Sequence, residues 1–247
     1  MANGFAFGST HWSVVARAAA PGSADARAAI EELCRAYWWP LYAYLRRIGR
    51  SHDDASDLVQ GLFSELIEKG RFAQADPDRG RFRSWLLSAL KFQISHEHER
   101  ERALKRGGRA RAIPLDRLDA ERRWQELSTP DLDAELLFDR AWALAVLERA
   151  LAAVGEAYAR AGKAELFAAL RPALVGEAAP EELRTVAARL GMSVGAVKSA
   201  SFRLRKALGE SIRAELAATV DDARDVEDEL NVLFAVLAAP PSRSPNP

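Results

Sequence analysis

A chain of 247 residues in which 49% are hydrophobic can bury one large core or two small ones. Its 35 cationic and 35 anionic side chains give a formal net charge of zero, which excludes a protein that is basic overall, so any nucleic-acid binding must come from local patches. The single cysteine, Cys34, excludes an intramolecular disulfide framework and a CxxC metal pair, and it fits a reducing cytoplasm.

The start of the chain lacks the pattern of an export signal. No basic segment followed by a continuous apolar run is present there, and nowhere do about 18 apolar residues follow one another. We therefore expect neither a signal peptide nor a membrane span, and a cytoplasmic location.

Apolar residues recur at steps of three and four almost throughout, without the alternation of strands, and this spacing predicts an all-α fold. The first run covers residues 24–48 and is interrupted by Pro40, which predicts a kink or two abutting helices. Its apolar positions are Ile30, Leu33, Tyr37, Leu41, Tyr44, Leu45 and Ile48.

Two more helices complete the first predicted domain, residues 1–106. Ser51 is suited to cap a helix over 53–68, with Asp53 and Asp54 in its first turn, where the helix dipole favours carboxylates. After a turn at 76–80, a third helix runs to about residue 106. The predicted core positions are Leu58, Leu62, Phe63, Leu66 and Ile67, then Phe82, Trp85, Leu86, Ala89, Leu90 and Ile94.

A basic patch occupies residues 79–111, where cations surround Trp85 and Phe92. Aromatic rings among cations suit single-stranded nucleic acid, because bases stack on the rings while the backbone charge is neutralised. Two alternatives stay open. Glu97, Glu99 and Glu101 would allow a solvated helix with local ion pairs, and Trp85 would serve as a core residue.

Residues 107–131 read as a linker with one short helix around 117–127. Helical spacing returns over 132–174, for which the sequence suggests no chemical role, and Pro180 opens a new helix. The second predicted domain spans residues 132–220.

The segment 180–208 has the spacing of a helix-turn-helix. Leu183, Val186, Ala187 and Leu190 share one face of a first helix that ends at Gly191, a residue suited to the left-handed position after a helix. Ser193 can cap a second helix with Val194, Val197 and Leu204 on its buried face. The alternative is a two-helix hairpin that only packs.

In a helix-turn-helix the second helix enters the major groove with its N-terminal half against base edges. Arginine and lysine can donate to guanine, a serine hydroxyl can serve base or phosphate, and an aromatic edge can contact a thymine methyl. The outward residues here are Lys198, Ser199, Phe202 and Arg203, followed by Arg205 and Lys206.

The last segment, residues 221–247, combines an acidic run with Leu230, Leu233, Phe234 and Leu237. The simpler interpretation is an amphipathic helix that folds back on the second domain with a solvated acidic face. The alternative is that this acidic helix competes with DNA for the basic recognition helix. The tail PPSRSPNP is typical of disorder.

No residue set supports catalysis, a metal or a cofactor. His11, His52, His96 and His98 lack companion ligands at metal spacing, and the GxxxxGK[ST], GxSxG and HExxH motifs are absent. We expect a protein that is not an enzyme and holds no cofactor.

Two segments together resemble the sigma-70 superfamily, in particular the extracytoplasmic-function (ECF) sigma factors. DDASDLVQGLFSELIEK followed by GRFRSWLLSALKFQISHEHERER resembles the second conserved sigma region, and the 180–208 unit resembles the fourth. YWWPLYAYLRR and STHWSVV further resemble a subgroup of large ECF-like sigma factors.

The resemblance implies a role for each segment. The helix over 53–68 would dock on the clamp of the polymerase largest subunit through Asp54, Asp57, Leu58, Gln60 and Phe63. The third helix would read the minus-ten element through Arg83, Trp85, Lys91, Phe92, Ser95 and His96. The helix over 194–208 would read the minus-thirty-five element through Lys198, Ser199, Phe202, Arg203, Arg205 and Lys206.

The sequence therefore predicts a sigma factor that binds RNA polymerase core, through its clamp and flap, and directs it to promoter DNA. An anti-sigma factor or a regulatory kinase is a further partner that the sequence leaves open. Two alternatives remain: a stand-alone helix-turn-helix regulator that never contacts polymerase, and a helical adaptor that binds only proteins.

Overall fold

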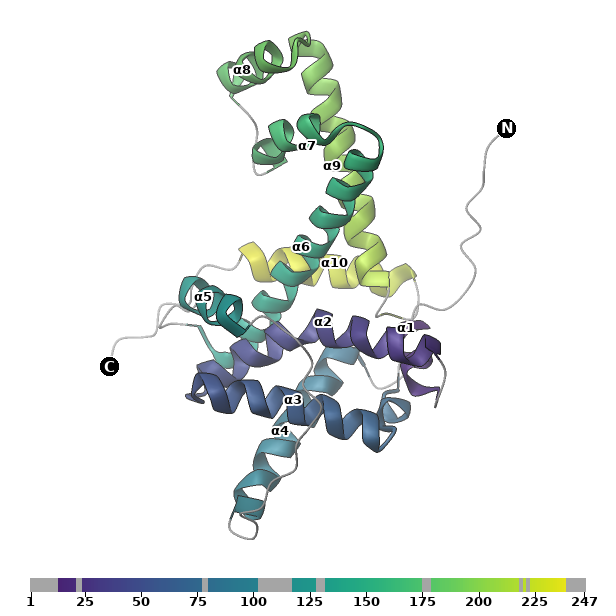
Figure 1. The fold of residues 1–247 in the computed structure, drawn as a ribbon, viewed down its shortest axis with the longest axis vertical. Coiled ribbons are helices and arrows are strands. Elements are labelled where there is room, and N and C mark those ends of the chain that lie inside the picture. Colours follow the sequence, from purple (N-terminus) through teal and green to yellow (C-terminus); the bar gives the residue numbers. More distant parts are fainter. Residues whose placement is uncertain are drawn as a thin grey trace. The chain divides into compact units, whose positions relative to one another are not determined.

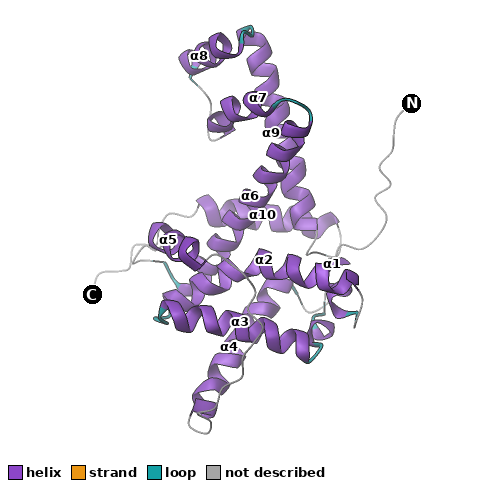
Figure 2. Ribbon diagram, viewed as in Figure 1, coloured by secondary structure: helices purple, strands orange, loops and turns teal. Residues whose placement is uncertain are grey.

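The computed structural model describes residues 13–20, 24–76, 80–101, 117–127, 132–174, 179–217, 220 and 223–238, and within them every regular element is a helix (Figures 1 and 2). The all-α prediction is confirmed. Predictions that fall on residues 107–116, on the side chains of Glu97, Glu99 and Glu101, and on the tail lie outside the described residues.

The chain folds as two compact units. The first comprises residues 1–145 and 216–247, and the second comprises residues 146–215. The boundaries fall inside two long helices, α6 (Ala134–Arg160) and α9 (Val194–Ala217). In the sequence, the second unit is therefore inserted within the first. The predicted domain boundaries at residues 106, 131 and 220 were instead drawn from the sequence motifs. The division of the chain into a region 2-like and a region 4-like domain stays a prediction.

α2 (Ala24–Arg47) is the centre of the first unit, and it contacts α1 (Ser13–Ala19), α3 (His52–Glu68), α4 (Phe82–Glu101) and α5 (Arg117–Leu127). It continues through Pro40 as one helix rather than as two. Tyr42 is fully buried in it. Cys34 of the same helix is also buried, and burial raises the pKa of its thiol to about 12, with Glu31 contributing.

The predicted cap of α3 is confirmed, because the Ser51 hydroxyl oxygen accepts the backbone N–H of Asp54 at 3.1 Å. Gly70, at φ 59°, then turns the chain into the short 3-10 helix η1 (Arg71–Gln74), which contacts α3. α3, η1 and α4 together form one side of the first unit.

The short helix predicted in the linker is α5, and it docks on α2. The Glu121 carboxylate accepts hydrogen bonds from Tyr42, at 2.5 Å, and from Arg46. The Tyr42 hydroxyl also lies 2.8 Å from His52 Nδ1, and Arg46 stacks over the Trp124 ring. α5 is therefore a packed part of the first unit.

The C-terminal helix α10 (Ala223–Ala238) also belongs to the first unit. Its folding back on the predicted second domain, residues 132–220, stays a prediction, because residues 132–145 and 216–220 of that domain belong to the same unit. Its buried face contains Val226, Glu229 and Leu233, while Phe234, predicted on the apolar face, is 55% exposed. Glu229 is buried because two arginines compensate its charge, as described below.

The second unit contains the end of α6, then α7 (Ala164–Leu170), η3 (Arg171–Leu174), α8 (Pro180–Leu190) and most of α9. Its core brings together side chains from these helices, namely Val154, Leu170, Ala187, Val197, Ala200 and Leu204. Val194 is 36% exposed rather than buried, because it stands at the first position of α9.

The predicted helix-turn-helix is confirmed as local structure. Gly191 adopts φ 62°, and the next residue, Met192, donates to the Ala187 carbonyl at 2.9 Å, which ends α8. The Ser193 hydroxyl oxygen then accepts the Ala196 N–H at 3.2 Å and caps α9.

Candidate nucleic-acid interface

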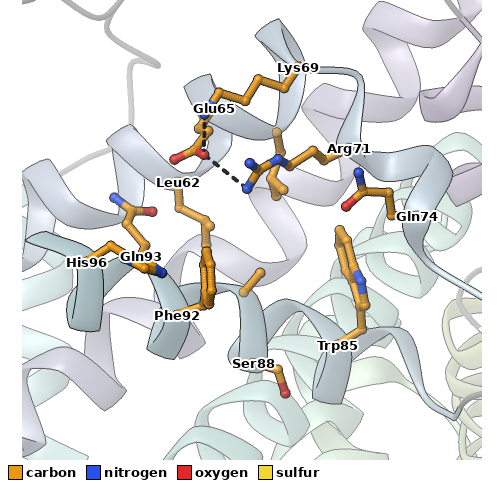
Figure 3. Close-up of a pocket in the computed structure, with 12 residues that line it drawn as sticks. Leu62, Glu65, Lys69, Arg71, Gln74, Trp85, Ser88, Phe92, Gln93 and His96 are labelled. Carbon is orange, nitrogen blue, oxygen red and sulfur yellow. Dashed lines mark hydrogen bonds and ion pairs between the residues drawn. The ribbon is translucent and has the colours of Figure 1, made fainter.

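A cavity of about 630 Å³ opens between α3, η1 and α4 in the first unit (Figure 3). Its volume falls within the range of small-molecule sites. The lining residues are Leu62, Glu65, Leu66, Lys69, Arg71, Gln74, Trp85, Ser88, Ala89, Phe92, Gln93 and His96.

Three rings of α4 face this cavity: Trp85, Phe92 and His96. They stand at steps of seven and four, so the helix presents them on one side. Phe92 is 57% exposed and meets the His96 ring edge-to-face at 4.2 Å between centroids. An exposed ring on a cavity wall is a surface on which a base can stack.

Cations stand at the opposite rim of the same cavity. Glu65 holds Lys69 at 2.7 Å and Arg71 at 3.0 Å, and these two side chains flank Gly70 (Figure 3). They lie across the cavity from the rings, where a nucleic-acid backbone could be neutralised. Neither residue was predicted as a contact, although two cations around one glycine directly after a helix could have indicated them.

Gln93 is a third lining residue that was not predicted from the sequence. Its Nε2 donates weakly to the Leu58 carbonyl at 3.4 Å, and its buried Oε1 accepts no hydrogen bond from the described residues. An amide oxygen at a cavity wall can accept from the amino group of a base.

Lys91 and Ser95 lie on another side of α4. Lys91 pairs with Glu135 of α6, and Ser95 donates to the Lys91 carbonyl at 3.0 Å. The hydrogen bond to Glu135 is the main cause that raises the pKa of Lys91, which is therefore cationic at neutral pH. Lys91 and Glu135 line a small groove of about 160 Å³ between α4 and α6.

Arg83 is buried, with only 5% of its side chain exposed. It pairs with Glu229 of α10 and with Asp139 of α6, at 3.1 Å, and its guanidinium stacks 4.2 Å from the Trp142 ring centre. The six predicted minus-ten residues thus divide into a cavity group (Trp85, Phe92 and His96), a second side (Lys91 and Ser95) and the buried Arg83.

The predicted polymerase-binding residues lie on α3. Asp54 and Asp57 are exposed and Gln60 is half-buried, while Leu58 and Phe63 are buried inside the first unit. The three polar residues are therefore those that a partner can contact on this surface, and the two apolar ones stabilise the helix beneath it.

The predicted recognition helix is the N-terminal half of α9. Lys198, Ser199 and Arg203 are exposed, and Phe202 is 69% exposed. Arg205 instead donates to the Ala173 carbonyl of η3 at 2.7 Å, and Lys206 lies 3.8 Å from Glu210. The N-terminal half of α9 therefore presents two cations, a hydroxyl and an aromatic ring on its exposed face.

The described residues contain neither a candidate metal site nor a candidate membrane span. No group of three or more His, Cys, Asp or Glu side chains there could hold a metal ion. None of the helices described is long and apolar enough to cross a membrane.

Comparison with known families gives one match. Residues 33–103 match the family Sigma-70 region 2, and this range covers most of α2 together with α3, η1 and α4, the elements that build the cavity. Searches of curated proteins and of solved structures found no match. Residues 33–103 are therefore similar to a sigma-70 region 2, and this match supports a sigma factor of the sigma-70 superfamily.

Proposed function

We propose that this chain binds RNA polymerase core and directs initiation at specific promoters, as an ECF-type sigma factor. The observation that carries the proposal is the coincidence of the region 2 match with a cavity that has aromatic rings on one wall and cations on the other. The polymerase would perform the chemistry, and this chain would supply recognition.

The first unit would hold the opened minus-ten segment as single-stranded DNA. Bases would stack on Trp85 and Phe92, while Lys69 and Arg71 neutralise the backbone. Gln93 would contact a base edge. His96 would contribute a ring, and Lys91 would reach a phosphate if the strand continues along α4.

The exposed carboxylates of α3 would bind the clamp of the polymerase largest subunit. Asp54 and Asp57 are the residues that this surface offers, with Gln60 beside them. Replacing both aspartates with asparagine removes two charges without changing side-chain size. The double variant is expected to lose affinity for core while its thermal melting stays near that of the parent.

The second unit would act as region 4 and read the minus-thirty-five element. Lys198, Ser199, Phe202 and Arg203 would contact the major groove, and Lys206 the backbone. Arg205, held by η3, would keep the recognition helix in place. The proposal also includes three partners to which it assigns no residues of this chain: the polymerase flap, an anti-sigma factor and a regulatory kinase.

Run-off transcription with purified polymerase core on genomic promoter fragments tests the proposal. Discrete new starts that depend on this protein, and that disappear with Lys198→Ala plus Arg203→Ala, are the expected result. DNA binding without core-dependent initiation would instead identify a stand-alone helix-turn-helix regulator. Binding to neither core nor DNA would leave the helical adaptor.

A further inference from the structure

A carboxylate from the end of the chain is buried against the start of the minus-ten helix. Glu229 of α10 is 3% exposed, yet it lies 146 positions along the chain from its partner Arg83. Its other oxygen lies 2.6 Å from Nε of Arg81. One side chain of α10 therefore holds the two arginines on either side of Phe82, the first residue of α4.

Because Glu229 and Arg83 are both buried, each needs the other to compensate its charge. Removing one partner of a buried ion pair leaves an uncompensated charge inside the protein, which is far more costly than losing an exposed pair. Among the described residues, Arg83 without Glu229 would keep Asp139 and the Trp142 ring as partners. The guanidinium would have to move toward water, and the first turn of α4 would move with it.

That first turn supports one wall of the cavity. Phe82 is buried and stacks on Trp85, with 5.4 Å between ring centres and 30° between ring planes. Phe82 also meets the Tyr37 ring of α2 edge-to-face at 5.3 Å. Trp85 lines the cavity, so the contacts run from Glu229 through the two arginines and Phe82 to a base-stacking ring.

We infer that Glu229 is a positioning residue for the minus-ten site: docking of the C-terminal helix α10 sets the first turn of α4 and, through Phe82, the place of Trp85. The C-terminal helix is then part of the DNA-reading apparatus of region 2, although it follows the helix-turn-helix in the sequence. The consequence for DNA binding rests on the proposed function, whereas the consequence for α4 itself does not.

The first test measures α4 directly on the free, full-length chain. Hydrogen exchange of residues 81–90, followed by mass spectrometry, would be compared between the parent and Glu229→Gln, which keeps the shape and removes the charge. Asp228→Asn is the matched control, because Asp228 is the preceding residue of α10, is exposed and loses the same charge. Faster exchange at the start of α4 in Glu229→Gln alone is expected.

The second test measures function on the complex with polymerase core. The probe is a fluorescent single-stranded oligonucleotide that carries the minus-ten segment of a promoter found by run-off transcription. Glu229→Gln is expected to weaken its binding about tenfold, which corresponds to roughly 1.4 kcal/mol, while affinity for core stays at the parent value. A merely structural role would lower both affinities together.

A milder variant keeps the test decisive if Glu229→Gln fails to fold. Arg81 is 41% exposed, so Arg81→Gln breaks one ion pair and leaves Arg83 with Glu229. It is expected to change exchange and oligonucleotide binding in the same direction by a smaller amount. Unchanged exchange at the start of α4 in both variants would overturn the inference.

Other outcomes separate this inference from the proposed function. Tighter oligonucleotide binding by Glu229→Gln would overturn positioning, because it would make α10 a competitor of DNA. If the parent complex binds no minus-ten strand, the proposed function fails, while the exchange result still decides whether α10 positions α4.

Discussion

Two cations of α4, Arg83 and Lys91, form ion pairs of very different strength. Arg83 and Glu229 are 5% and 3% exposed, while Lys91 and Glu135 are 40% and 63% exposed. Water screens the second pair, and holding two long side chains in one geometry costs entropy. In the buried first pair, water cannot solvate the charge that remains when its partner is removed.

Replacing each cation should therefore give very different stability losses. Arg83→Ala is expected to lower the free energy of unfolding by about 3 to 5 kcal/mol, because it leaves Glu229 buried without its main partner. Lys91→Ala is expected to cost about 0 to 1 kcal/mol. Urea unfolding followed by circular dichroism measures both, and equal losses would contradict the burial of the Arg83 network.

Arg203 is an exposed cation of α9, the proposed recognition helix, and its replacement should act on DNA binding rather than on stability. Arg203→Ala is expected to cost about 1 to 3 kcal/mol in binding to a minus-thirty-five duplex and to relax the sequence preference. Arg160→Ala, an exposed arginine at the end of α6, is the control. An equal loss on unrelated DNA would show that Arg203 contacts only phosphate.

At the scale of elements, the Glu121 carboxylate joins α5 to α2 through Tyr42 and Arg46. Burial raises the pKa of Glu121, but the Tyr42 hydrogen bond and the nearby charges of Arg46 and His52 outweigh it, and the net pKa lies below the usual 4.5. For Tyr42, burial and the bond to Glu121 raise the pKa to about 12. The charged carboxylate and the neutral phenol are thus the forms that hold α5.

The pH dependence of α5 follows from these two shifts. A lowered carboxyl pKa stabilises docking above pH 4.5, and this contribution is lost as the pH falls through the folded-state pKa. A raised tyrosine pKa stabilises docking below pH 10, and this contribution is lost between pH 10 and 12.

Hydrogen exchange of residues 117–127 should therefore be slowest at intermediate pH after correction for intrinsic rates. In Glu121→Gln, these residues should exchange faster at neutral pH. Their exchange should show no acid limb, that is, no further increase as the pH falls. Glu126→Gln, on the exposed side of the same helix, is the control. An acid limb that persists in Glu121→Gln would assign the effect to another group.

The turn of the helix-turn-helix depends on backbone conformation alone. Gly191 is left-handed, and a Cβ added there would meet no atom within 4 Å. Gly191→Ala should therefore cost about 1 to 2 kcal/mol through backbone strain. Thermal unfolding of the full chain measures this loss, and a stabilised variant would contradict the left-handed turn.

Local sequence signals were sufficient to predict most of the helices and several of the residues that cap them. Ser51, Gly191 and Ser193 act within four residues of their partners, so the sequence alone predicted their roles. The Arg83–Glu229 pair joins residues far apart in the chain, and periodicity carries no information on such a pair. For this reason the pairing of Arg83 with Glu229 of the C-terminal helix could not be predicted from the sequence.

At the scale of the whole molecule, the C-terminal helix should stabilise the first unit rather than the second. A chain that ends at Val220 keeps α9 but lacks Glu229. It is expected to exchange faster in α4, while residues 180–208 keep the exchange of the parent. Loss of protection in residues 180–208 alone would instead favour packing of this segment on the second unit.

The insertion of one unit within the other also sets an order of folding during synthesis. Residues 146–215 are contiguous, so they leave the ribosome as a complete unit before α10 does. The first unit has to wait for Glu229, which follows the second unit in the chain. A chain terminated between the second unit and α10 therefore carries a complete helix-turn-helix and a first unit that still lacks Glu229.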